Sequence, residues 1–280
     1  MQNIMRLPRC LVLVFLPLAF ALTLSACSDK KNKPNYVQGS VDILYNKAMD
    51  QLLAQNYKQA AKLFDEVDRQ HPYSTWATRA QLMSAYAKYR NKKYDDAVIG
   101  LERYIQLHPN ARDIAYAYYL KGQAYYEQIK DVRRDQTAAR QAGASFKALI
   151  RRHPNSRYVR DARRKIDLVN DHVAGKEMSV GRYYLKRNRQ LAAIGRFRTV
   201  ISKYQSTSHV PEALYRLSAA YTALGVTDEA RKITAVLGYN YPASEWYVDS
   251  YQLVTGRDVK RTGPVKKTES FGRRVLRWLF

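Results

Sequence analysis

Cysteine is nearly absent from this chain of 280 residues. Its two cysteines are Cys10, inside an apolar leader, and Cys27, directly after that leader. The body therefore has no thiol for a disulfide, a metal site or a nucleophile. A body of this length can bury a core without disulfides or metals, so thiol chemistry and a disulfide-built fold are excluded.

Catalytic motifs are also absent. The chain has no G-x-S-x-G, no Walker loop, no H-E-x-x-H and no spaced set of cysteines and histidines. Three of the five histidines, His71, His108 and His153, occupy the same place before a proline in similar turns, which indicates turn residues and not ligands. The sequence predicts a protein that is not an enzyme and that has no metal and no cofactor.

The leader has the three parts of an export signal. Arg6 and Arg9 precede an apolar run, Leu11 to Thr23, and small residues precede Cys27. The run of 13 residues is short against the roughly 20 of a membrane span, although an uncleaved anchor is the alternative. A cysteine here resembles the bacterial lipobox. We therefore predict that residues 1–26 are removed, that Cys27 is acylated, and that residues 27–38 form a linker. By the sorting rule of Gram-negative lipoproteins, which this leader resembles, Ser28 after the cysteine implies a lipid anchor on the periplasmic face of the outer membrane.

Acidic residues are few against basic ones. The chain has 48 Lys and Arg against 24 Asp and Glu, a formal charge of +24. Such a balance often indicates nucleic acid, but an exported protein rarely meets it. We expect acidic proteins and membrane surfaces as partners, and no nucleic acid.

One pattern recurs five times along the body. Its first copy is Ala60-x3-Phe64-x2-Val67-x4-Pro72, and the other copies begin at Ala97, Ala142, Ala193 and Ala230, with Gln205 in place of the proline in the fourth. A small residue precedes each of these alanines by twelve positions, or by twenty in the third copy. An alanine lets two helices approach closely, the large residue packs between them, and the proline ends the helix.

This pattern resembles the tetratricopeptide repeat, a helical hairpin of about 34 residues. The resemblance predicts an all-α fold, a right-handed superhelical solenoid of about five hairpins. The expected domain spans 39–255, with repeats at 41–74, 78–111, 115–156, 174–207 and 211–244. The third repeat carries eight extra residues, about Lys130 to Thr137, which form either a docking surface or a longer solvated loop. We expect the following turn serines to cap the next helix: Ser74, Ser156, Ser208 and Ser244.

Tyrosine is abundant, with 23 residues. In such arrays the first helices line a concave groove, and the repeat register assigns six tyrosines and two arginines of the first three repeats to it. Tyrosine offers rigid contact area and a hydroxyl, and arginine can clamp a carboxylate. The alternative is that several tyrosines pack between helices. The predicted groove residues, suited to an extended peptide, are Tyr45, Arg79, Tyr86, Tyr89, Arg90, Tyr116, Tyr119 and Tyr126.

Residues 256–280 carry no repeat and are basic. We expect them to form a flexible tail whose last ten residues make a short amphipathic helix, fit for an anionic membrane surface or a partner's groove. Its candidate contact residues are Phe271, Arg273, Arg274, Arg277, Trp278 and Phe280.

Longer segments extend the resemblance to a particular family. They include Leu44 to Ala48, Phe64 to Tyr73, Ala115 to Gly122, and Arg157-Tyr158-x2-Asp161. Together with the lipobox, they resemble the tetratricopeptide-repeat lipoproteins of the outer-membrane β-barrel assembly machinery over about 27–250.

The resemblance implies a scaffold that docks on the barrel-forming central subunit and works with the other lipoproteins of the complex. It implies Arg196 at the docking contact, and N-terminal repeats that receive the C-terminal signals of unfolded outer-membrane proteins. Two alternatives stay open. The first is a repeat lipoprotein that handles envelope polymers or pilots a secretion pore, and the second is a nucleic-acid binder, prompted by charge alone.

Overall fold

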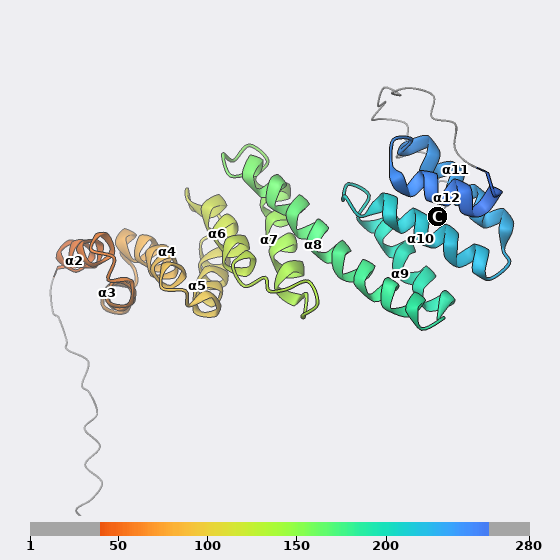
Figure 1. The fold of residues 1–280 in the computed structure, drawn as a ribbon. Helices are drawn as coiled ribbons and strands as arrows, with labels where there is room; N and C mark the ends of the chain where they lie inside the picture. Colours follow the sequence, from red (N-terminus) through yellow and green to blue (C-terminus); the bar gives the residue numbers. More distant parts are fainter. Residues whose placement is uncertain (1–39, 258–280) are drawn as a thin grey trace, which may run out of the picture. The chain divides into compact units, whose positions relative to one another are not determined.

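The computed structural model describes residues 40–257, and this part of the chain is built from helices, with no strand (Figure 1). The described helices are α2 (Val41–Leu53), α3 (Tyr57–Gln70), α4 (Thr75–Arg90), α5 (Tyr94–Leu107), α6 (Ile114–Tyr126), α7 (Thr137–Arg152), α8 (Val159–Lys186), α9 (Gln190–Lys203), α10 (Val210–Ala223), α11 (Thr227–Asn240) and α12 (Glu245–Thr255).

Consecutive helices pair as antiparallel hairpins, and each hairpin packs on the next. The pairs are α2–α3, α4–α5, α6–α7, α8–α9 and α10–α11, and α12 packs on both helices of the last pair. First helices of adjacent hairpins also touch, as α2 touches α4 and α4 touches α6. The predicted fold class, a helical solenoid of the tetratricopeptide kind, is confirmed.

The recurring pattern forms the core. All five pattern alanines are fully buried, as are the large residues Phe64, Phe146 and Phe197. Burying one such aromatic side chain contributes about 1.5–3 kcal/mol. In the fifth hairpin Thr234 stands at this place, and its hydroxyl contacts the Ser218 hydroxyl at 2.9 Å, so that a hydrogen bond takes the place of aromatic packing.

The turns within the hairpins are also equivalent. Gln55, Lys92, Asn188 and Gly225 each have a φ between 56° and 75° and lie between the first and second helices of four hairpins. The third hairpin has ten residues at this place, Glu127 to Gln136. The repeats thus share their turn geometry except where the sequence carries extra residues.

The extra residues of the third repeat fold against α8. The Lys176 ammonium donates to the Arg133 carbonyl at 2.5 Å, and Gln136 is buried. Val132 lies beside Gly175, where an added Cβ would be 3.5 Å from its Cγ1. Part of the segment is therefore packed, while its charged side chains Lys130 and Asp131 are exposed.

One helix is longer than the repeat pattern predicts. α8 has 28 residues and combines the first helix of the fourth repeat with the stretch 159–173, which the pattern had left unassigned. Its first half packs on α7 and its second half on α9. α8 therefore supplies two core clusters, one through Val169 and Val173 and the next through Ala174 and Met178.

The serine caps were predicted correctly in one case. The Ser74 hydroxyl accepts from the Ala77 N–H at 3.1 Å and caps α4. Ser244 precedes α12 without a side-chain cap bond. For Ser156 and Ser208 the prediction was wrong, because Tyr158 and His209 occupy the N-cap positions of α8 and α10.

Candidate functional site

The eight predicted groove residues lie on the first helices of the first three hairpins, as the register predicts. The six tyrosines are half-buried and the two arginines are exposed. Each of these tyrosines is partly packed between helices and partly accessible. Packing between helices and exposure on a groove therefore do not exclude each other.

Arg90, at the end of α4, holds two tyrosines. Its guanidinium donates to the Tyr86 hydroxyl at 2.7 Å and to the Tyr57 hydroxyl at 2.6 Å. It also lies over the Tyr57 ring, 4.8 Å from the centroid. These contacts preorganise an exposed cation between two aromatic side chains.

A second group joins α6 to the start of α8. Tyr119 stacks on Tyr158 with 5.0 Å between centroids, and Tyr116 lies 5.4 Å from the same ring. The Tyr119 hydroxyl donates to Asp161 at 2.6 Å. Burial, and for Tyr119 also Asp161, raises the pKa of Tyr116 and Tyr119 well above the usual value of 10.0, so that both phenols stay protonated donors.

The ends of this surface are also aromatic and cationic. Tyr45 lies 4.8 Å from Trp76, and the Arg79 guanidinium is 5.7 Å from the Trp76 ring. At the other end the Lys165 ammonium is 4.4 Å from the Tyr126 ring. We call the whole set the tyrosine–cation face, and its members are Tyr45, Tyr57, Trp76, Arg79, Tyr86, Tyr89, Arg90, Tyr116, Tyr119, Tyr126, Tyr158 and Lys165.

Four of these residues were not predicted: Tyr57, Trp76, Tyr158 and Lys165. Tyr57 starts a second helix, and Trp76 lies one turn before the predicted groove positions of α4. Tyr158 and Lys165 belong to the start of α8, outside the repeat pattern. Arg157-Tyr158-x2-Asp161 was noted as a helix start, and that signal could have placed Tyr158 on the face.

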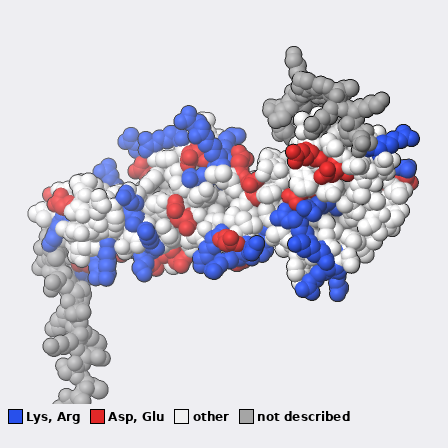
Figure 2. All heavy atoms as spheres, viewed as in Figure 1, with Lys and Arg blue, Asp and Glu red and all other residues white. Residues whose placement is uncertain are grey.

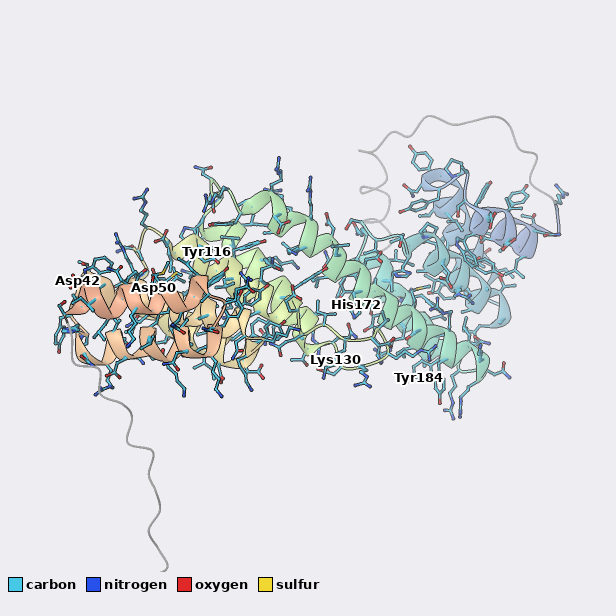
Figure 3. The ribbon with its side chains drawn as sticks, turned by 60° about the vertical axis from the view of Figure 1, so that its left-hand side comes forward. Asp42, Asp50, Tyr116, Lys130, His172 and Tyr184 are labelled. Carbon is cyan, nitrogen blue, oxygen red and sulfur yellow. The ribbon has the colours of Figure 1, made fainter. Side chains whose placement is uncertain are left out.

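A cleft of about 1300 Å³ continues from Tyr126. The α6–α7 connection forms one wall and α8 the other, and Figure 3 labels Lys130, His172 and Tyr184 around it. His172 lines this cleft, and its Nε2 is buried without a hydrogen-bond partner. The cleft combines aromatic, cationic and acidic lining.

The predicted docking residue Arg196 lies on α9 and is half-exposed. Its guanidinium pairs with Glu177 of α8 at 3.0 Å. This ion pair raises the pKa of Arg196, which stays charged.

Several sequence predictions fall outside the described residues 40–257. They are Cys27 with its leader, and the tail residues Phe271, Arg273, Arg274, Arg277, Trp278 and Phe280. Within the described residues, no helix is both long and apolar enough to cross a membrane, and no group of metal-ligating side chains gathers.

Comparison with known proteins defines the class. Residues 38–237 match the family described as "Outer membrane lipoprotein". A relative from Caulobacter vibrioides is 47% identical over 242 residues, which cover 86% of this chain and 79% of the relative. One from Rickettsia prowazekii is 47% identical over 237 residues, 85% of this chain and 94% of the relative. One from Neisseria meningitidis is 34% identical over 253 residues, 85% and 95% of the two chains.

Each of these three relatives is named outer membrane protein assembly factor BamD. The chain belongs to the BamD family.

Proposed function

We propose that this chain is a non-enzymatic scaffold in the assembly of outer-membrane proteins, and that its tyrosine–cation face receives the C-terminal segments of unfolded clients. The proposal rests chiefly on one observation: in a chain of the BamD family, tyrosines and cations gather in two contacting groups, one on α2 and α4 and one on α6 and the start of α8. Such a face suits an extended polypeptide better than a small molecule.

The chemistry of the face fits a segment with aromatic side chains and a free carboxylate. The rings of Tyr116, Tyr119 and Tyr158 provide flat contact area with few rotamers to fix. Arg79 and Arg90 are exposed and present planar donors that match a carboxylate. Both arginines already lie against aromatic rings, which limits the entropy lost on binding.

The first test is the binding of a peptide that carries the C-terminal residues of an outer-membrane barrel. Replacing Tyr86 and Arg90 by alanine removes one ring and its cation, and we expect binding roughly tenfold weaker or more, since each lost contact costs about 1 kcal/mol or more. Fluorescence anisotropy of the labelled peptide measures the effect.

A matched double variant, Tyr73→Ala with Lys92→Ala, serves as the control. Both residues are exposed, lie in turns and are not members of the face, and their loss should leave the affinity unchanged. If Tyr86→Ala/Arg90→Ala keeps wild-type affinity with an intact helical spectrum, the face is not the client site.

We further propose that the C-terminal hairpins dock on the barrel-forming central subunit through Arg196. Its guanidinium is half-exposed and held by Glu177, so it can reach an acidic partner while keeping its orientation. Arg196→Ala should reduce the amount of the large barrel protein that co-purifies from membranes. Arg198→Ala on the same helix should leave that amount unchanged, and equal recovery with both variants would remove Arg196 from the contact.

Attachment to the outer membrane through acylated Cys27, facing the periplasm beside the other lipoproteins of the complex, completes the proposal. Three acyl chains hold a protein on a bilayer far more firmly than one. Mass spectrometry of the mature N-terminus tests this directly. An unmodified Cys27, or a chain that still carries residues 1–26, would contradict it.

A further inference from the structure

Six arginines flank the connection between α7 and α8. All six are exposed, and residues 151–164 contain a single acid, Asp161, whose carboxylate accepts from Tyr119 at 2.6 Å. We call this set the arginine patch, and its members are Arg151, Arg152, Arg157, Arg160, Arg163 and Arg164. In Figure 2, Lys and Arg gather along the edge that lies over this connection.

The arginine patch is not neutralised by the protein itself. Among the described residues none of its six members forms an ion pair. By contrast, Arg182 of α8 pairs with Glu212 of α10 at 2.9 Å. Arg152 and Arg157 instead contact the rings of neighbouring tyrosines, contacts that leave their positive charge in place.

At the start of α8 this charge works against folding. Arg160 lies in the first turn of α8, where the helix dipole disfavours a cation by about 0.3–1 kcal/mol. Arg160 and Arg164 are also like charges one turn apart. Arg151 and Arg152 lie in the last turn of α7, where the helix dipole favours cations, but fold stability gives no reason for the three arginines at the start of α8.

We propose that the arginine patch binds the phosphate head groups of an anionic lipid surface. The planar guanidinium fork matches phosphate oxygens, and each basic residue near such a surface adds about 1 kcal/mol. The family is described as an outer membrane lipoprotein, so its members are attached to a bilayer. The anionic lipid head groups of that bilayer therefore lie close to the protein. No large apolar side chain is exposed between residues 151 and 165, which fits peripheral contact without insertion.

The test measures binding to vesicles by flotation. The protein runs from residue 27 to 280 with Cys27→Ser, so that every described residue is kept and no acyl chain attaches it. Wild type should float with phosphatidylcholine vesicles that contain phosphatidylglycerol and stay behind with pure phosphatidylcholine. Arg160→Glu/Arg163→Glu/Arg164→Glu should bind the anionic vesicles roughly tenfold less or weaker still.

The matched control is Lys58→Glu/Lys62→Glu/Arg103→Glu, which changes the net charge equally on exposed positions of α3 and α5. It should retain most of the binding, and both variants keep the basic tail. If the patch variant and the control variant lose vesicle binding equally, the effect is due to net charge alone and the proposal is overturned. Stronger binding of the patch to polyglutamate than to vesicles would also overturn it, because it would indicate an acidic protein partner.

Circular dichroism checks that each variant is folded. If charge reversal unfolds the chain, the neutral variant Arg160→Gln/Arg163→Gln/Arg164→Gln takes its place, with the same expected direction. Unchanged vesicle binding by a folded variant of either kind contradicts the proposal.

Discussion

At the scale of single residues, two glycines set how closely hairpin helices approach. Gly122 and Gly181 hold equivalent places and face the fully buried rings of Phe146 and Phe197. A Cβ added at Gly181 would lie 2.5 Å from Cε1 of Phe197, well inside contact distance. The sequence pattern predicted a small residue there, and the structure shows that nothing larger than glycine fits without moving the ring.

Gly181→Ala should therefore destabilise the chain, although alanine is the better helix former. Overpacking a filled core costs about 1–3 kcal/mol, more than the gain in helix propensity. Gly195→Ala is the control, because a Cβ at Gly195 meets nothing within 4 Å. It should raise the free energy of unfolding by up to about 1 kcal/mol. Urea denaturation compares the two, and a stabilising Gly181→Ala would contradict this packing.

Glu212 is the most heavily paired acid of the described chain. Its carboxylate accepts from Arg182 at 2.9 Å and from Arg216 at 2.5 Å. Burial by itself would raise the pKa of Glu212, but these two arginines outweigh burial and hold the pKa below its ordinary 4.5. The carboxylate therefore stabilises the fold above that ordinary value, and the contribution fades as the pH falls through the lowered pKa.

Glu212→Gln should accordingly lower the free energy of unfolding at neutral pH by about 1.5–3 kcal/mol, the range for hydrogen bonds to charged groups. The gap to wild type should close as the pH drops below about 4. Glu229→Gln, which breaks an exposed pair with Lys232, should change little at any pH. A gap that is constant with pH would show that the charge of Glu212 does not matter.

Residue contacts across hairpins were the least predictable part of the site. The repeat register placed the eight groove residues on their helices, because it depends only on local spacing. It could not show that Tyr119 reaches Asp161, 42 residues away, since that contact depends on how the start of α8 packs beside α6. Trp76 meets Tyr45 across α2 and α4, and Tyr158 was missed although the helix start that contains it had been noted.

At the scale of elements, α8 links two parts of the core. It runs without a break through 28 residues and contributes to the core clusters on both sides of residue 173. The sequence predicted the five hairpins because each carries the pattern alanine, and all but the fifth carry the large residue one turn later. The first half of α8 lacks that pattern, so its continuity with the fourth repeat could be seen only in the structure.

Asp167→Pro tests whether the continuity of α8 matters. Asp167 is exposed in mid-helix, so the change mainly removes a helix hydrogen bond and adds a backbone clash, a cost of about 3 kcal/mol or more. We expect thermal unfolding to split into two transitions as the two core clusters separate. Thr75→Pro, at the first position of α4 where proline is tolerated, should keep a single transition near that of wild type.

At the scale of the whole molecule, contacts between neighbouring helices build the fold, and many basic side chains form no ion pair within the described residues. Helix contacts run mainly between neighbours along the chain, as expected of a solenoid. The tyrosine–cation face runs from α2 to the start of α8, and the arginine patch flanks the connection between α7 and α8. The composition gives the excess of basic residues. Only the structure shows which of the described cations form no ion pair.

The most direct measurement of the central claim is site-specific photocrosslinking in intact cells. A photoreactive phenylalanine analogue placed at Tyr86, on the tyrosine–cation face, should crosslink to newly exported outer-membrane proteins before they insert. The same analogue at Leu107, exposed at the end of α5, should give no such product. Client crosslinks of equal yield from both positions, or none from Tyr86, would contradict the claim that this face receives unfolded clients.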